Sequence, residues 1–202
     1  MNTAITPSDG RTARGERTRD AVVEAMLSLI DEGVLSPRAR QVSERAGVSL
    51  RSVFQHFADL ESLFFAASER QVERMMPLAA HIKSDAPYAE RLAAFVEARC
   101  QLLEALTPVR RAALLQEPFS TEIAGRLRWA REMNREESER VFAAELAALP
   151  ATDRRDVAIA LHAATEWTTW ETLRAHDGLT EGAARRVMTR TIEALLKKEL
   201  PR

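Results

Sequence analysis

Apolar residues recur every three to four positions along most of the chain, and no run alternates apolar and polar residues at a period of two. This spacing predicts amphipathic helices rather than strands. Proline and glycine separate the periodic segments and set their ends. The expected helices cover residues 12–32, 38–45, 50–56, 59–76, 88–106, 109–117, 121–149, 152–177 and 180–200. The pattern therefore predicts an all-α fold of about nine helices.

The composition bounds the number of domains and the compartment. A chain of 202 residues with 46% hydrophobic residues fits one larger or two small domains. We expect a flexible arm at 1–11, a first domain at 12–76 and a second at 77–202, because the chain changes character after Pro77. The single Cys, the lack of an apolar signal core and the lack of an apolar run of about 18 residues predict a cytoplasmic protein with no membrane span.

The sequence AGVSLRSVFQHF at 46–57 carries the clearest functional signal. Gly47 supplies the left-handed backbone that ends one helix, and Ser49 can cap the next. Val53 and Phe57 point inward at i and i+4 of that second helix. The side chains left facing outward are Arg51, Ser52, Gln55 and His56. A short braced helix that offers donors and acceptors on one face is suited to reading the DNA major groove.

The run from Thr12 to Phe65 resembles the DNA-binding domain of TetR-type transcriptional regulators. The matching positions are Gly33, Ala46-Gly47-Val48-Ser49, Phe54-Gln55-His56-Phe57 and Asp59-Leu60-Glu61-Ser62-Leu63. The resemblance implies an N-terminal three-helix helix-turn-helix domain, followed by a larger helical domain for ligand binding and dimerisation. Phe54 and Leu60 depart from the family pattern, which has Tyr and Lys there to contact phosphate. The alternative interpretation of the motif is a generic helical corner in a protein that does not bind DNA.

Arginines gather around this motif although the net charge is −1. Residues 11–19 hold four arginines and one glutamate, and four more arginines follow between 38 and 51. This local basic footprint is typical of a sequence-specific regulator, and the alternative is a solvated charged surface. In the resembling family, an arginine at the position of Arg40 contacts a base. The predicted DNA-binding residues are Arg17, Arg38, Arg40, Ser49, Arg51, Ser52, Phe54, Gln55 and His56.

The last two long expected helices, 152–177 and 180–200, have the pattern of an interface. The first of them is apolar on two sides, so it must lie between other elements. One side packing in its own subunit and the other against a second copy would make a four-helix, two-fold contact, as the resemblance also implies. The sequence thus predicts a homodimer through these helices. The alternative is a monomeric helical domain.

Three charged residues, Arg99, Glu137 and Glu166, fall on apolar stripes of the second domain. Burying an unpaired charge is costly, so these groups either face a cavity, or they pair with one another inside the protein or reach solvent through a slight rotation of their helices. In the first case the cavity would bind a small-molecule effector between apolar walls. The predicted ligand-binding residues are Phe95, Arg99, Trp129, Met133, Glu137, Glu166 and Trp170. The second case, an internal Arg99–Glu ion pair, stays open.

Other chemistry has weaker support. His162 and Glu166 stand at i and i+4 but lack a third metal ligand nearby, so no metal and no cofactor are predicted. Cys100 follows Arg99, whose charge could lower the thiol pKa for redox sensing, and the alternative is a small core residue. No enzyme motif occurs. The sequence predicts a ligand-responsive homodimeric repressor bound to a near-palindromic operator. The alternative is a helical small-molecule-binding or scaffold protein without sequence-specific DNA binding.

Overall fold

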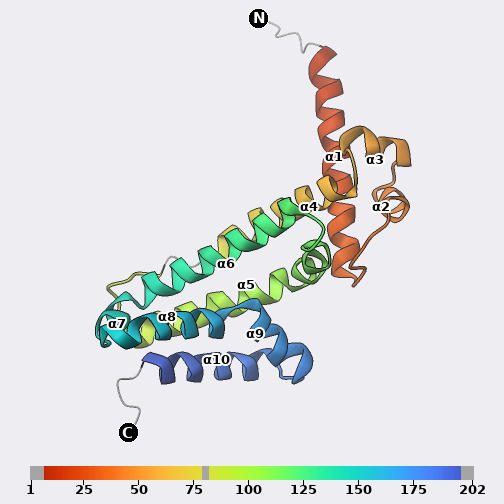
Figure 1. Ribbon diagram of the computed structural model, residues 1–202. Coiled ribbons are helices and arrows are strands. Elements are labelled where there is room, and N and C mark those ends of the chain that lie inside the picture. Colours follow the sequence, from red (N-terminus) through yellow and green to blue (C-terminus); the bar gives the residue numbers. More distant parts are fainter. Residues whose placement is uncertain (1–6, 79–81, 197–202) are drawn as a thin grey trace, which may run out of the picture. The chain divides into compact units, whose positions relative to one another are not determined.

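The computed structural model describes residues 7–78 and 82–196, with side chains described for 12–77 and 82–196. The described residues form helices and no strand, so the predicted all-α fold is confirmed (Figure 1). The ten α-helices of the described chain are α1 Pro7–Asp31, α2 Ala39–Ala46, α3 Leu50–His56, α4 Leu60–Met75, α5 Tyr88–Gln116, α6 Thr121–Val141, α7 Ala143–Ala147, α8 Ala151–Thr165, α9 Trp167–Glu171 and α10 Glu181–Leu196. A 3₁₀ turn (Met76–Leu78) follows α4, and a π-helical turn (Thr172–His176) follows α9.

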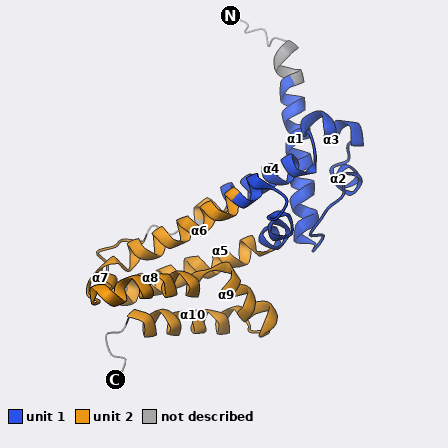
Figure 2. Cartoon of the chain, in the orientation of Figure 1, with its two compact units in different colours: residues 1–74, 108–124 blue, residues 75–107, 125–202 orange. Residues whose placement is uncertain are grey.

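The chain forms two compact units (Figure 2). The first holds the described residues up to Arg74 together with Pro108–Ala124, and the second holds Met75–Thr107 and the described residues from Gly125 on. The segment Pro108–Ala124, which the sequence analysis assigns to the second domain, thus belongs to the first unit. Helices α5 and α6 each contribute to both units.

In the first unit, helices α2 and α3 pack on α1. The core between them contains Val42 of α2, Val53 of α3 and the buried face of α1. Gly47 adopts a φ of 66°, and the amide of Val48 donates to the carbonyl of Ser43 (3.0 Å). This left-handed C-cap ends α2 as predicted. Ser49 Oγ accepts from the amide of Ser52 (3.0 Å) and so caps α3, also as predicted.

The start of the first helix differs from the prediction. Helix α1 begins at Pro7 rather than at Thr12, so residues 7–11 are its first turns and not a flexible arm. Proline is favoured in the first turn of a helix, where its missing N–H costs nothing. The hydrophobic pattern predicts no helix there because the segment before Thr12 has no apolar stripe. Residues 1–6 of the predicted arm lie outside the described residues.

Pro108 does not divide the fifth helix, contrary to the sequence-based expectation of two helices at 88–106 and 109–117. Helix α5 runs through it from Tyr88 to Gln116. Proline removes one amide donor and crowds the preceding turn, so tertiary contacts must hold the helix there. Thr107 supplies such a contact, because its hydroxyl donates to the carbonyl of Leu103 (2.7 Å) and accepts from Trp167 Nε1 (2.9 Å).

The expected helix 121–149 is divided at Phe142, where the backbone leaves the α-helical region. The Phe142 ring is fully buried and meets Phe95 edge-on, with ring centroids 5.2 Å apart. Arg91 donates a hydrogen bond to the carbonyl of Val141 and pairs with Glu145 of α7 (2.6 Å). The break therefore places an aromatic ring in the core while a buried arginine satisfies the freed carbonyl.

The expected helix 152–177 is divided at Glu166, whose backbone is extended (φ −74°, ψ 153°). The Thr165 hydroxyl donates to the carbonyl of Leu161 (3.0 Å), and the Thr169 hydroxyl donates to that of Ala163 (2.6 Å). Neither Pro nor Gly marks this break, so the sequence pattern could not reveal it. Near the break, the carbonyl of Ala163 accepts from both the amide of Glu166 (3.4 Å) and the Thr169 hydroxyl, so this end of α8 keeps hydrogen-bond donors.

Candidate nucleic-acid interface and effector site

Helix α3 presents one face to solvent and buries the other. Val53 is 1% exposed and the adjoining Phe57 is 5% exposed, which confirms the predicted inward pair. Arg51 and Gln55 are exposed, one helical turn apart, and His56 is half-buried. The hydroxyls of Ser49 and Ser52 lie 2.9 Å apart and bond to each other. In the isolated chain these two serines serve the cap, while Arg51 and Gln55 are free to meet a partner.

The predicted DNA-binding residues of α2 lie at the start of that helix. Arg38 is exposed, and its amide donates to the side chain of Gln41 (2.9 Å). Arg40 has an 85% exposed side chain whose Nε donates to Glu44 one turn later (2.8 Å). Because an exposed ion pair of this kind is weak, Arg40 can exchange Glu44 for another acceptor at little cost.

Arg45 belongs to the same arginine cluster but has a different role. Its guanidinium makes two hydrogen bonds to Glu32, directly after α1, both of 2.6 Å, and a third to Ser28 of α1. This bidentate contact fixes the angle at which α2 leaves α1. Arg45 therefore holds the reading unit in place rather than facing a partner.

Leu50 and Arg19 lie near this surface but were not among the predicted contacts. Leu50 of α3 is 46% exposed beside Phe54, which is 48% exposed. The i, i+4 spacing of these apolar residues was readable in the sequence, but only Phe54 was predicted as a DNA contact. The guanidinium of Arg19 of α1 stacks on the Phe57 ring, 5.0 Å from its centroid. This contact joins residues 38 positions apart, so no local sequence pattern predicts it.

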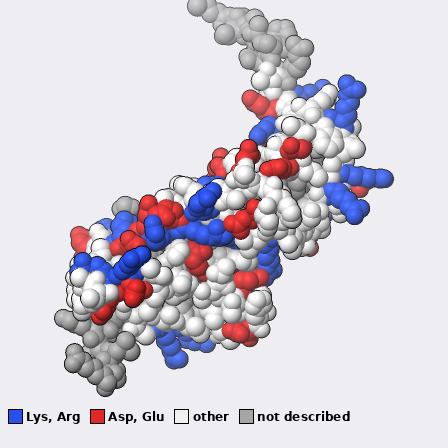
Figure 3. All heavy atoms as spheres, viewed as in Figure 1, with Lys and Arg blue, Asp and Glu red and all other residues white. Residues whose placement is uncertain are grey.

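A cavity of about 420 Å³ lies in the first unit, between α1, α4 and the turn after α3. Arg19, His56 and Phe57 line one side of it, and Glu69 and Arg70 of α4 line another. Arg70 is held by Asp20 (2.8 Å) and Glu24 (3.1 Å) of α1. On the face drawn in Figure 3, basic side chains project from the region of α2 and α3, where the sequence has arginines and no lysine.

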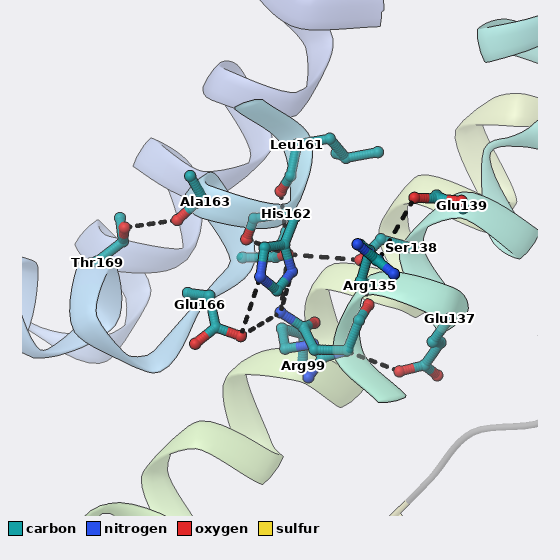
Figure 4. Close-up of polar contacts among 12 residues, drawn as sticks. Arg99, Arg135, Glu137, Ser138, Glu139, Leu161, His162, Ala163, Glu166 and Thr169 are labelled. Atoms are coloured by element: carbon teal, nitrogen blue, oxygen red, sulfur yellow. Dashed lines mark hydrogen bonds and ion pairs between the residues drawn. The ribbon is translucent and has the colours of Figure 1, made fainter. Parts of the chain in front are cut away.

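The charged residues on apolar stripes meet in the second unit (Figure 4). Arg99 of α5 is 6% exposed and donates to Glu137 of α6 at 2.7 Å. Burial lowers the pKa of Arg99, and the nearby carboxylates of Glu137 and Glu166 oppose that shift. Of the two cases left open by the sequence, the internal Arg99–Glu137 ion pair is therefore present.

Glu166 is held by a different set of partners. Its carboxylate accepts from Asn134 Nδ2 at 2.9 Å and lies 3.8 Å from His162 Nε2. Asn134 is itself buried, and its Oδ1 has no hydrogen-bond partner among the described residues; the same is true of Arg99 Nε. The side chain that ends α8 thus belongs to a polar cluster in which two buried polar atoms are unsatisfied.

The predicted apolar walls are only partly brought together. Phe95 lies under Arg99, whose guanidinium is 5.5 Å from the ring centroid. Trp170 is buried and donates its indole N–H to Glu104 (2.8 Å). Trp129 and Met133 instead lie on the exposed side of α6, at 45% and 37% exposure, and Arg126 stacks on Trp129. The pattern misplaced these two because a stripe on a long helix does not show where the facing helix ends.

Cys100 is a core residue and not the exposed reactive thiol that redox sensing requires. It is fully buried, and desolvation raises the pKa of its thiol to about 12. The expected lowering by a neighbouring cation is outweighed, because burial away from water disfavours the thiolate more strongly. Within the described chain, no three His, Cys, Asp or Glu side chains are grouped as a metal site would require. Among those residues, no helix is long and apolar enough to cross a membrane.

The fold is that of the TetR-type transcriptional regulators, as the sequence motif indicated. A transcriptional regulator from Rhodococcus sp. RHA1 is 19% identical with a TM-score of 0.67, over 90% of this chain and 95% of that one. A TetR-like transcriptional regulator from the same organism is 18% identical with a TM-score of 0.60, over 92% and 97% of the two chains. At this identity the likeness establishes the fold. No protein-family model and no curated protein matches the sequence.

The buried ion pair predicts an asymmetric response to mutation. Glu137→Gln should lower the free energy of unfolding by about 2–3 kcal/mol, because it leaves the Arg99 charge buried without its partner. Arg99→Met should cost less, since the Glu137 side chain is 31% exposed and water can solvate it. The double variant should recover part of the loss. Denaturant melts of the four proteins measure this, and a Glu137→Gln variant as stable as the wild type would contradict it.

The buried thiol predicts slow alkylation. Because the folded-state pKa of Cys100 is raised from 9.0 to about 12, the thiol stays protonated in the folded protein at pH 8. Iodoacetamide should therefore label the native protein far more slowly than the urea-unfolded protein. The raised pKa also adds stability below pH 9 that is lost as the pH rises toward 12, because the unfolded chain releases this proton first. Equal labelling rates in the two states would show that Cys100 is accessible.

Proposed function

Because the chain has the fold of the TetR-type regulators, we propose that it is a DNA-binding transcriptional regulator, not an enzyme, and that it acts in the cytoplasm as a ligand-responsive repressor. The observation that carries the proposal is the geometry of α2, the Gly47 turn and α3. The turn sets a short capped helix against a braced one, and Arg51 and Gln55 project from its exposed face. Such a helix fits the width of the major groove and offers bidentate donors and acceptors to base edges.

The residues around α3 divide the work of DNA binding. Arg51 and Gln55 are suited to base edges, guanine and adenine respectively. Arg38 and Arg17 are exposed and suited to phosphate, which would set the register of the helix in the groove. Arg19 adds a cation beside the start of α4, held in place by the Phe57 ring. Phosphate contacts of this kind release counterions, so we expect binding to weaken steeply with salt.

We assign dimerisation to the outer faces of α8 and α10. These helices pack on each other within the second unit, and each also keeps an exposed apolar strip. Ile159 of α8 is 54% exposed and Val187 of α10 is 38% exposed, with the small exposed Ala163 and Ala194 on the same two helices. Small residues allow two copies to approach closely. A two-fold pairing would place two reading helices on successive major grooves of a near-palindromic operator.

We assign effector sensing to the polar cluster around Glu166. Glu166 ends α8, one of the two helices assigned to the dimer contact, and its carboxylate is held by Asn134. An effector that bonds to Glu166, Asn134 or Arg99 would compete with these internal contacts and change how α8 ends. By binding one conformation better than the other, it would shift the dimer away from the spacing that fits DNA.

The proposal predicts a specific loss in Arg51→Ala. The full-length protein should shift duplexes selected from a random library, and the variant should lose about 1–3 kcal/mol of affinity for the selected site. The loss on random DNA should be smaller, because the contact to a base edge is sequence-specific. Arg128→Ala removes an exposed arginine of α6 and is the matched control. Gel shifts measure both affinities. Failure to select any sequence would refute the proposed function, and equal losses on both DNAs would assign Arg51 to phosphate.

The dimer assignment predicts a monomer in Ile159→Glu. The substitution would place two carboxylates in a contact that excludes water, where unpaired charges are strongly unfavourable. The variant should elute and scatter light as a monomer, keep its thermal stability as a chain, and bind the selected operator more weakly. Phe119→Glu, at a site 88% exposed in the first unit, is the control for adding the same charge. A dimeric Ile159→Glu would remove α8 from the interface.

A further inference from the structure

Helix α3 carries two parallel strips of different chemistry on its solvent side. One strip is polar and consists of Arg51 and Gln55, one turn apart. The other is apolar and consists of Leu50 and Phe54, also one turn apart and both close to half exposed. Residues at i and i+4 of a helix lie on one face, so the two apolar side chains adjoin each other and run alongside the polar strip. The exposed surface of α3 therefore offers a partner both polar and apolar side chains.

About half of each side chain of the apolar strip is open to solvent. Val53 and Phe57 already bury the inner side of α3, with exposures of 1% and 5%. Phe54 has no hydroxyl, so it can offer a partner only its ring. Single exposed apolar residues are common, but two adjoining ones beside base-reading groups form a surface for a partner with matching apolar groups.

The charge around the strip indicates the class of partner. Arg38, Arg40 and Arg51 are exposed on the same two-helix unit, and one carboxylate, Glu44, pairs with Arg40. The partner must therefore be anionic and still present apolar groups within reach of a helix. In the DNA major groove the apolar group on the base edges is the C5 methyl of thymine, and leucine and phenylalanine contact it well.

We propose that Leu50 and Phe54 read thymine methyl groups next to the base pair that Arg51 reads. This inference rests on the proposed function, because it requires α3 to lie in the major groove. It assigns part of the sequence preference to apolar contact rather than to hydrogen bonds. The operator half-site then contains thymine beside the guanine or adenine read by the polar strip, and loss of a methyl group weakens binding even though every hydrogen bond is retained.

Replacing thymine by uracil in the operator tests this directly, because uracil lacks only the methyl group. The full-length protein first selects its site from random duplexes, and each thymine of that site is then replaced by deoxyuridine in turn. We expect one or two positions at which the replacement weakens wild-type binding about fourfold, the effect of withdrawing one methyl group from an apolar contact. Replacing the other thymines should leave the binding affinity unchanged.

Variants of the two residues assign the effect to the apolar strip. In Leu50→Asn, which keeps the side-chain size, and in Phe54→Ala, the sensitive uracil replacement should cost nothing further, since its partner is already gone. Leu115→Ala removes a similarly exposed leucine of the same compact unit and should retain the fourfold effect. Thermal melts confirm that each variant is folded.

The outcomes separate this inference from the proposed function. A selected site that contains no thymine, or one in which no uracil replacement matters, would overturn the inference while leaving the regulator intact. An equal uracil effect in the wild type and in both variants would also overturn it, because other residues would then read the methyl groups. If no sequence is selected at all, the proposed function falls and this inference falls with it.

Discussion

The structure depends on the requirement that each carbonyl freed at a buried helix end finds a donor. A helix that stops inside a packed unit leaves its last carbonyls unpaired, and each one buried away from water costs free energy. Arg91 donates to Val141 where α6 stops, and Arg154 donates to Leu146 and Leu149 after α7. The Thr169 hydroxyl donates to the carbonyl of Ala163 near the end of α8. In the second unit, arginine side chains therefore meet this requirement where α6 and α7 end.

Meeting the requirement with arginines brings charge into the interior. Arg91 and Arg99 are both almost fully buried, and each has a glutamate partner on a facing helix. Those pairs tie α5 to α6 and α7 by contacts that tolerate only one arrangement. The cluster at Glu166 is less completely paired, since Asn134 Oδ1 and Arg99 Nε have no hydrogen-bond partner among the described residues.

In the first unit, a seven-residue helix is fixed in place while its outer face stays exposed to solvent. The Gly47 turn, the Ser49 cap and the buried Val53 fix α3 from one side. The Arg45–Glu32 contact fixes α2 on α1. These groups fix the orientation of α3. Its outer face therefore exposes the side chains of Leu50, Arg51, Phe54 and Gln55 to solvent. Rigid support beneath a bare face is what precise recognition of a groove requires.

The sequence by itself determined the features that depend on neighbouring residues. The turn at Gly47, the cap at Ser49 and the inward pair of α3 follow from local rules of backbone freedom and helical spacing, so they were predictable and the all-α fold with them. The same holds for the charged residues on apolar stripes, which spacing alone marks as unusual.

Only the tertiary structure decided the features that depend on distant partners. Helix α5 continues through Pro108 beside the hydrogen bond from Trp167 to Thr107, and α8 ends at Glu166, whose carboxylate is held by Asn134. Arg99 pairs with Glu137, and Glu166 accepts a hydrogen bond from Asn134. Asn134 does not lie on any apolar stripe that the sequence pattern identified. Trp129 lies on the exposed side of α6 and does not join Phe95 in the wall that the sequence predicted. Each outcome is set by which helix lies opposite, and helical periodicity carries no information about that.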